Sequence, residues 1–395
     1  MADTLKRQLG LGLLTAYGVG IMVGAGIYVL VGVAAGEAGV WAPLSFLLAA
    51  IVAVPTALSF SELSARIPES AGDSSYVELG LHQHWLALVV GAINVIAGTV
   101  ASAAVLRGGV GYLTSVAPVS FEVAVIGLGV VLTLIAIIGV LESLAFAAIL
   151  TVIEVIGLLI IIWVGFGAVP VADWLSPPPP EWSGIAAATV FAFFAFIGFD
   201  DLVNMAEEAR SPERNMPRAI LISLAITTLL YMLVSMAAVR SVPQDLLAAS
   251  ERPLALVWET ATGKSATFLA VIAVAAALNG VLAQIVMASR VLFGLGRRSP
   301  ALAVFHHTHP RFGTPVLGSI VIGVVVIISA LTLPVAALAE ITTMALLVVF
   351  AIVNAALIGL KRNKATSPFN VHVTVPWFGL LACVAALIAA IGAGV

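Results

Sequence analysis

The sequence predicts an all-α protein that crosses a membrane many times. Apolar runs of about 20 residues recur from one end of the 395-residue chain to the other, and each is long enough to cross a bilayer core. The chain is 62% hydrophobic and only 9% charged, whereas soluble domains carry about 25% charged residues. No soluble core needs that much apolar sequence.

We predict eleven membrane spans in a single domain, residues 1–395, with no separate soluble domain. The spans cover, in approximate numbers, residues 10–35, 40–64, 84–112, 121–141, 144–169, 184–206, 218–239, 266–294, 315–333, 338–360 and 374–394.

The basic residues predict the orientation of these spans. With eleven spans, Arg240, Arg252 and Lys264 fall on one side of the membrane, Arg107 and Arg290 fall within spans, and the other Lys and Arg residues of the 17 fall on the N-terminal side. Loops on the cytoplasmic side carry the excess of Lys and Arg. We therefore expect a multi-pass protein of the cell (inner or plasma) membrane, with a cytoplasmic N-terminus and an external C-terminus.

The first span contains a stretch, Gly18 to Tyr28, that is too rich in glycine for a stable helix. Gly18, Gly20, Gly24 and Gly26 each cost about 1 kcal/mol of helix propensity relative to Ala. A break in a spanning helix has to line a cavity or face protein, because lipid cannot satisfy its backbone. Close helix packing by Gly20 and Gly24 is the alternative interpretation.

A second interruption lies in the sixth span. Phe191 to Asp201 places Gly198 among aromatic residues and follows it with two adjacent carboxylates. The sixth span comes five spans after the first and runs in the opposite direction. Interrupted segments at matching positions of two inverted halves indicate the binding site of a secondary transporter. The halves would be residues 10–169 and 184–360, with an extra helix at 374–394.

Several motifs accompany the two interruptions. The first span has spaced glycines ending in Gly-Ala-Gly-Ile-Tyr28, and the sixth reads Phe-Phe-Ala-Phe-Ile-Gly-Phe-Asp200. Further motifs are Glu207 to Ile220, Ser289-Arg290 and His309 to Pro315. Together they resemble the amino acid–polyamine–organocation (APC) transporters over spans 1 to 10. The resemblance implies a 5+5 inverted-repeat fold with broken helices 1 and 6.

Half-helices that end inside the membrane suit a zwitterion. Their freed N–H groups favour a carboxylate and their freed C=O groups favour an ammonium. The resemblance implies that the substrate-binding residues are Met22, Val23, Gly24, Ala25, Gly26, Ile27, Phe194, Phe196, Ile197, Gly198 and Asp200.

The resemblance also assigns a part to each group of these residues. The N–H groups of residues 25–27 would hold the carboxylate, while the carbonyls of Met22, Val23 and Ile197 would hold the ammonium. Phe194 would be an aromatic gate and Phe196 would line the pocket. Some relatives have Ser in place of Ala25 and Trp in place of Phe194, so this site would rely on its backbone and have an apolar gate.

Asp200 follows the unwound Gly198. It either senses the substrate, supports proton-dependent gating or only caps freed N–H groups. Asp201 adds a second carboxylate, which shares the site or lies on the other face.

Glu154 is the predicted coupling residue. It lies about 11 residues into the fifth span, roughly 16 Å deep, near the position where some proton-coupled relatives have a lysine. Three roles remain open: a proton carrier, a structural partner of a cation such as Arg290, and a residue that attracts sodium.

Other polar residues within spans have less specific interpretations. Arg107 reaches the headgroups by snorkelling or contacts the substrate. Asn279, Gly280 and Gln284 of the eighth span line the cavity or hold helices together.

The sequence thus predicts a secondary active amino acid transporter that works by alternating access and is coupled to protons. The alternatives are an exchanger, a sodium symporter, or a polyamine or amine transporter. We expect a small-molecule substrate and a lipid bilayer as partners, no nucleic acid and no obligate protein partner. Two histidine groups, His82-Gln-His84 and His306-His-Thr-His309, lie in cytoplasmic connections without an accompanying Cys, and the single Cys383 lies in an apolar run. We therefore predict no metal site and no cofactor, and no enzymatic nucleophile–base set is present.

Overall fold

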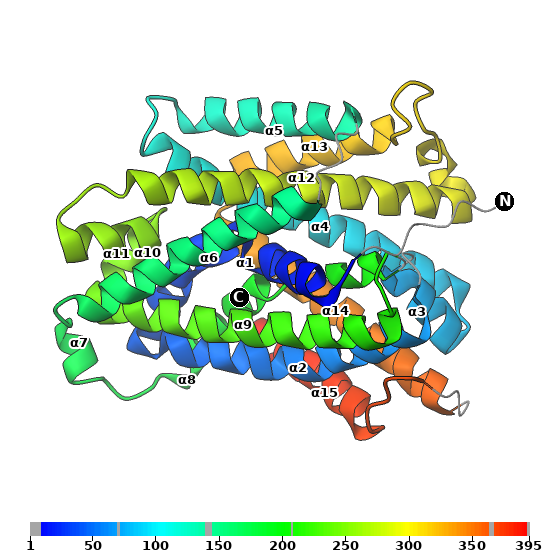
Figure 1. The fold of residues 1–395 in the computed structure, drawn as a ribbon, viewed down its shortest axis with the longest axis horizontal. Helices are drawn as coiled ribbons and strands as arrows, with labels where there is room; N and C mark the ends of the chain where they lie inside the picture. Colours follow the sequence, from blue (N-terminus) through cyan, green and yellow to red (C-terminus); the bar gives the residue numbers. More distant parts are fainter. Residues whose placement is uncertain (1–8, 69–71, 139–143, 207, 363–366, 393–395) are drawn as a thin grey trace.

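The computed structural model describes residues 9–68, 72–138, 144–206, 208–362 and 367–392, and these residues form helices joined by short connections (Figure 1). The α-helices are α1 (Leu11–Ala38), α2 (Ala42–Arg66), α3 (Gly72–Leu81), α4 (His84–Thr114), α5 (Phe121–Ile138), α6 (Leu144–Gly167), α7 (Ala172–Leu175), α8 (Trp182–Ala195), α9 (Pro212–Ser241), α10 (Gln244–Ala249), α11 (Pro253–Thr262), α12 (Thr267–Arg298), α13 (Val316–Thr332), α14 (Val335–Arg362) and α15 (Thr374–Gly392). Three 3-10 helices are η1 (Gly39–Trp41), η2 (Asp201–Met205) and η3 (Pro300–Phe305).

The helices agree with a multi-pass membrane protein. A helix lies in each of the predicted span ranges. In the described part of the chain, 8 helical stretches are long and apolar enough to cross a membrane. Three shorter apolar helices cover Leu11–Gly24, Trp182–Ala195 and Val316–Thr332.

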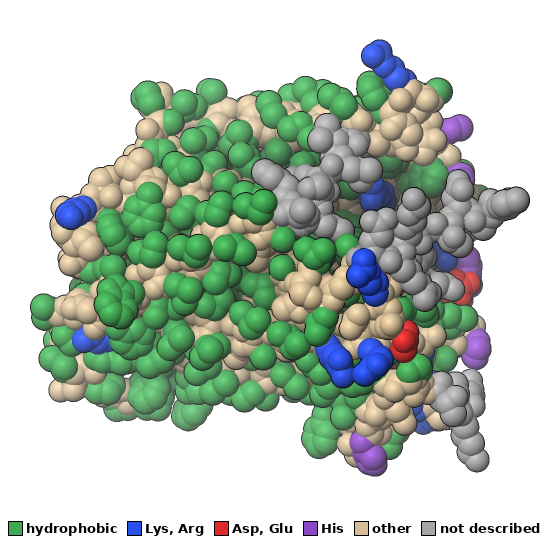
Figure 2. All heavy atoms as spheres, viewed as in Figure 1, with side chains coloured by type: hydrophobic (Ala, Val, Ile, Leu, Met, Phe, Trp, Pro, Cys, Tyr) green, Lys and Arg blue, Asp and Glu red, His purple; other side chains and the backbone are tan. Residues whose placement is uncertain are grey.

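The surface has the distribution of side chains that a bilayer requires. Large apolar side chains point outward along the helices, for example Trp163, which is 82% exposed on α6. In Figure 2 the face in view is hydrophobic over most of its length, Lys and Arg side chains lie toward its two ends, and the His side chains in view lie at the right-hand end. An exposed apolar surface of this extent would be a liability in water.

Two groups of helices meet in the interior. One apolar cluster takes most of its residues from α1, α2, α6, α8, α9 and α14 and the other from α4, α5, α12 and α13, although α1, α4, α8, α12 and α14 contribute to both. Ile197, which follows α8, packs against both clusters. The chain just after α8 therefore lies at the boundary between the two groups.

The connection between α9 and α12 is partly buried. Two short helices, α10 and α11, form in it. They bury Leu247, Leu254 and Val257 completely, and they pack against α1 and α6.

A buried ion cluster ties α2 to the α14–α15 connection. The Glu62 carboxylate is fully buried and pairs with Arg66 and with the Lys361 ammonium, the latter at 2.8 Å. It also accepts the backbone N–H of Val371 at 2.8 Å. These bonds hold the last helices of the chain against the rest.

The segment before α1 pairs with the segment after η2. The N–H of Leu9 donates to the carbonyl of Glu208 at 3.0 Å, and the N–H of Arg210 donates to the carbonyl of Leu9 at 2.8 Å. Leu9 and Ala209 form an isolated parallel β-bridge.

Candidate functional site

The first interruption is at Gly24. This residue has φ 20° and ψ −160°, while α1 continues as a helix on both sides of it. Only glycine adopts a positive φ of this kind without strain. Met22, Val23 and Ile27 beside the break are buried. The side chain of Ala25 lies outside the described residues.

Gly20 has a different role from Gly24. A Cβ at Gly20 would lie 2.1 Å from the Thr151 hydroxyl on α6. The glycine-rich stretch therefore serves both predicted purposes, because Gly20 permits close packing of α1 on α6 and Gly24 breaks the helix.

The second interruption follows α8. Ala195 ends the helix, and the N–H groups of Phe196 and Ile197 turn back to the carbonyls of Phe193 and Phe194 at 3.0 and 3.1 Å. Gly198 then takes a φ of 124°, and the chain resumes as η2. The predicted unwinding at Ile197-Gly198 is therefore present.

The two interruptions touch each other in the interior. A Cβ on Gly198 would lie 2.4 Å from Ile21 Cγ2, so α1 passes directly against the Gly198 backbone. Gly26 in turn lies over α8, where an added Cβ would be 3.7 Å from Ala195 Cα and 3.8 Å from the Phe194 ring.

Tyr231 of α9 connects the two interruptions. Its hydroxyl lies 2.5 Å from the carbonyl oxygen of Met22 and 2.9 Å from that of Ala195. Its ring packs against Phe196, with ring centroids 5.1 Å apart. Phe196 is fully buried in this contact, and it lines neither of the two cavities described below.

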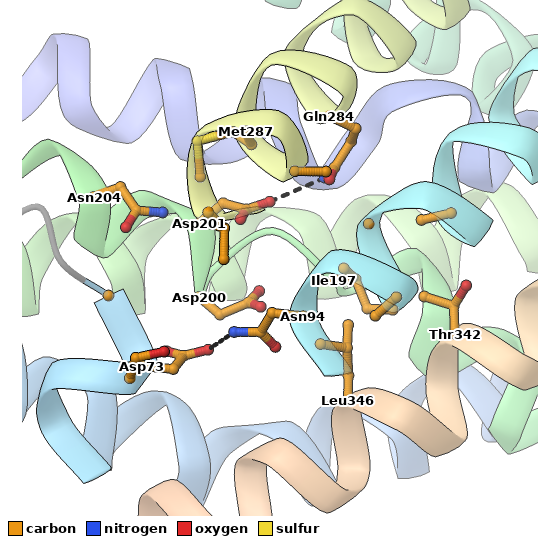
Figure 3. A pocket seen from close by; sticks show the side chains of 17 residues that line it. Asp73, Asn94, Ile197, Asp200, Asp201, Asn204, Gln284, Met287, Thr342 and Leu346 are labelled. Carbon is orange, nitrogen blue, oxygen red and sulfur yellow. Dashed lines mark hydrogen bonds between the residues drawn. The ribbon is translucent and has the colours of Figure 1, made fainter. Parts of the chain in front are cut away.

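A polar cavity of about 100 Å³ opens beside the second interruption (Figure 3). One water needs roughly 10–15 Å³ of such space, so this cavity holds several. It lies between α4, α12, α14, the start of α3 and the segment after α8. Its polar lining is Asp73, Ser74, Asn94, Asp200, Asp201, Asn204, Gln284 and Thr342.

The cavity is acidic. Three carboxylates face it, and its described lining includes no Lys or Arg. Gln284 donates to Asp201 at 3.0 Å, and Asn94 donates to Asp73 at 2.7 Å, as the dashed lines in Figure 3 indicate. Asp200 and Asp201 thus share one site, and the lining suits water or a positively charged group.

Asp200 caps the interruption. Its carboxylate accepts the N–H of Gly198 at 2.9 Å, and the residue is 8% exposed. The predicted capping of a freed N–H group is therefore present, at the edge of the acidic cavity.

Asp73 lies on the short helix α3, outside the long apolar spans. Burial raises the pKa of its carboxyl to about 7, the nearby Asp200 carboxylate adds to the rise, and the Asn94 hydrogen bond opposes it. The sequence analysis did not predict that Asp73 and Asn94 line a cavity. The features that could have indicated it are a carboxylate directly after Gly72 and an amide within an apolar run.

The other side of the interruptions is closed. There a cavity of about 10 Å³ lies against Phe194 and Gly26, which is room for at most one water. Phe194 itself is 6% exposed. The larger cavity therefore lies on the α3 side of the second interruption, where Ile197 and Asp200 line it, and no residue of α1 is among its described lining.

Glu154 lies on α6 behind the first interruption. It is 3% exposed, and its Oε2 has no hydrogen-bond partner among the described residues. Tyr28 of α1 donates to the Glu154 backbone carbonyl at 3.1 Å. The suggested pairing with Arg290 is wrong, because Arg290 is exposed on α12 and the described residues contain no ion pair between them.

Arg107 joins helices and does not line the cavity. Its guanidinium donates to the Ala330 carbonyl at 2.7 Å and lies 4.8 Å from the centroid of the Phe121 ring. Of the three polar or small residues expected in the eighth span, Gln284 lines the cavity, whereas Asn279 and Gly280 are not among its lining residues.

Comparisons with known proteins cover nearly the whole chain. The profile of the amino acid permease family matches residues 9–395. The chain is 27% identical over 391 residues to the branched-chain amino acid permease BcaP of Bacillus subtilis (strain 168), covering 92% of this chain and 83% of that protein. It is 30% identical over 394 residues to the cationic amino acid transporter 4 of Homo sapiens, covering 93% of this chain and 62% of that protein. It is 29% identical over 384 residues to the methylthioribose transporter of Bacillus subtilis (strain 168), covering 92% of this chain and 83% of that protein.

Proposed function

The chain belongs to the amino acid permease family of the APC superfamily, and from this premise we propose that it is a secondary active transporter of amino acids. The transporter works by alternating access and is coupled to protons. The observation that supports this most strongly is the meeting of two interrupted helices in the interior, at Gly24 and Gly198. Irregular backbone inside a membrane is tolerated only where protein buries it or where it lines a water-filled cavity, and a polar cavity adjoins the second interruption.

The proposed architecture has eleven spans in two inverted repeats, residues 10–169 and 184–360, with an extra helix at 374–394. Two facts support it: a helix lies in each range, and the interruptions are in the first and sixth of them. The N-terminus is cytoplasmic and the C-terminus external. The acidic cavity then opens on the cytoplasmic side of the site, because it adjoins α3.

The substrate's head group binds to the two interruptions. Its carboxylate binds the N–H groups of residues 25–27, and its ammonium binds the carbonyl ends of the half-helices at Met22, Val23 and Ile197. Opposite partial charges at these helix ends favour this orientation. Phe194 closes the site on the side away from the cavity, where it is buried.

Glu154 carries the coupled proton. Its support is a buried carboxyl whose Oε2 lacks a partner among the described residues, because a carboxylate charge without a hydrogen-bond donor is costly to bury and protonation removes that charge. Sodium symport and exchange are the alternative couplings.

Purified protein in liposomes tests the function. Saturable, stereoselective counterflow of L-leucine or L-arginine, with the D-enantiomers and protein-free liposomes as controls, is expected. Flux that rises linearly with concentration would indicate a channel and would contradict the proposal.

Three imposed gradients separate the couplings. A proton symporter accumulates substrate when the outside is acidic, a sodium symporter needs external sodium, and an exchanger needs amino acid inside. Accumulation that depends only on internal amino acid would reject proton coupling.

Amine or polyamine transport is the second candidate function. The carboxylates Asp73, Asp200 and Asp201 around one cavity favour it, and the name of the methylthioribose transporter shows that a relative takes a substrate other than an amino acid. A thermal-shift screen of purified protein with amino acids and with putrescine distinguishes the two. Stabilisation by putrescine and by no amino acid would favour the second function.

A further inference from the structure

Two helix C-termini point at one place in the interior. The first half of α1 ends at Gly24 and α8 ends at Ala195. Each end leaves carbonyl groups without intrahelical partners and carries a partial negative charge. In α8, tight turns satisfy the carbonyls of Phe193 and Phe194, which leaves the Ala195 carbonyl to another donor.

The Tyr231 hydroxyl is that donor, and it serves both helices. It lies 2.5 Å from the Met22 oxygen and 2.9 Å from the Ala195 oxygen. The two carbonyl oxygens are therefore at most about 5.4 Å apart, the two distances together. A single N–H donor group hydrogen-bonds at 2.7–3.2 Å, so one ammonium can also span these two oxygens.

We propose that Tyr231 is a positioning residue whose hydroxyl stands in for the substrate ammonium at Met22 and Ala195 while the site is empty. This inference rests on the proposed function, in which an ammonium binds the carbonyl ends of the half-helices, and it adds the Ala195 carbonyl to the acceptors named there. One hydroxyl proton satisfies the two carbonyls only partly, whereas an ammonium brings three N–H donors and a full charge.

The packing around Tyr231 allows its hydroxyl to be tested by itself. The ring is fully buried and lies edge-on to Phe46, at a centroid distance of 5.9 Å, and against Phe196. Tyr231→Phe keeps this packing. The contacts of Gly198 with Ile21 and of Gly26 with Ala195 keep the two interruptions together in the variant.

Removing the Tyr231 hydroxyl therefore destabilises the substrate-free protein more than the substrate-bound protein. In the empty variant the two carbonyls lack their donor, while in the loaded variant the ammonium satisfies them. A neutral buried hydrogen bond corresponds to about a three- to tenfold change in an equilibrium constant. Tyr231→Phe is expected to bind and transport amino acids with a KM lower by about that factor.

Tyr112→Phe is the matched control. Tyr112 is also fully buried, and its hydroxyl donates to a backbone carbonyl of α1, that of Tyr28, at 2.8 Å. This bond lies in the continuous second half of α1, away from the interruption. Both variants lose a buried hydrogen bond, so both unfold at a lower temperature, but only Tyr231→Phe should change KM.

The experiment compares wild type and the two variants in counterflow and in thermal unfolding. The probes are L-leucine, L-arginine and 4-methylpentanoate, which is leucine without its amino group. For Tyr231→Phe we expect a lower KM and a larger ligand-induced rise in Tm with the amino acids only. Inhibition by 4-methylpentanoate should not change.

A KM for Tyr231→Phe that equals that of Tyr112→Phe, or exceeds the wild-type value, would overturn the inference. An equal gain for 4-methylpentanoate would overturn it too. If wild type responds to no amino acid, the proposed function itself fails, and the inference with it.

Should Tyr231→Phe not fold, 3-fluorotyrosine at position 231 provides the second test. It is a stronger donor of nearly the same size, so KM should rise, and an unchanged KM refutes the proposal.

Discussion

Replacing Gly198 with alanine should strain the second interruption in two separable ways. The backbone φ of 124° costs a residue with a side chain about 1–3 kcal/mol. The new Cβ would lie 2.4 Å from Ile21 Cγ2 and 3.3 Å from the Ile21 carbonyl carbon. Relieving that overlap costs about 1–3 kcal/mol more. The free energy of unfolding should therefore fall by about 2–6 kcal/mol.

The protein contains its own reporter for this experiment. Cys383 is the single cysteine and is 1% exposed, so a thiol-reactive dye labels it only on unfolding. The matched control is Gly318→Ala in α13, whose new Cβ would lie 3.5 Å from the Ser289 carbonyl oxygen, an ordinary contact. We expect an apparent Tm several degrees below wild type for Gly198→Ala and no clear change for the control.

A double variant divides the cost into its two parts. Ile21→Ala removes the Cγ2 atom that the new Cβ meets. In this background, Gly198→Ala should therefore lower the free energy of unfolding by less than it does in wild type, because the overlap is gone. The part due to the backbone φ should remain. Equal Tm values for Gly198→Ala and Gly318→Ala would refute the reasoning.

Three further predictions concern buried carboxyl groups. Glu154→Gln should abolish accumulation driven by a proton gradient and leave counterflow intact; undiminished proton-driven uptake would exclude Glu154 as the proton carrier. The pKa of Asp73 is raised to about 7 from an ordinary value of 3.8, so the folded state holds its proton where the unfolded state has lost it. Stability due to this group should be greatest below about pH 4 and fall as pH rises through 7. A pH series of apparent Tm should flatten in Asp73→Asn and not in Asp173→Asn, which changes an exposed residue; parallel curves would contradict this. Glu62→Gln should lower stability by about 3–5 kcal/mol, because its two basic partners lose their countercharge; an unchanged Tm in the dye assay would argue against the ion cluster.

The interruptions could be predicted from the sequence because their signal is local. Glycine density marks Gly24, and a glycine between aromatic residues and carboxylates marks Gly198. Both positions have a positive φ in the structure. The multi-pass helical character was predictable for a similar reason, since the long apolar helices coincide with apolar runs of the sequence.

The surroundings of the interruptions could not be predicted, because they depend on how helices distant in sequence pack. Asp73 reaches the cavity only because α3 folds back beside α4, and no spacing in the chain encodes the distance from Asp73 to Asn94. Tyr231 bonds to backbone carbonyls, which leave no mark in a sequence. Charge alone suggested Arg290 as a partner for Glu154, but the Arg290 side chain is exposed whereas Glu154 is buried.

The β-bridge between Leu9 and Ala209 has a mechanical consequence for the first half of α1. This half-helix is fastened to the segment after α8 at its start by the bridge and near its end by the contact of Ile21 with Gly198. At its start, the half-helix cannot separate from this segment without breaking the two backbone hydrogen bonds of Leu9. We expect any widening of the cavity at the α3 end to move these two segments together.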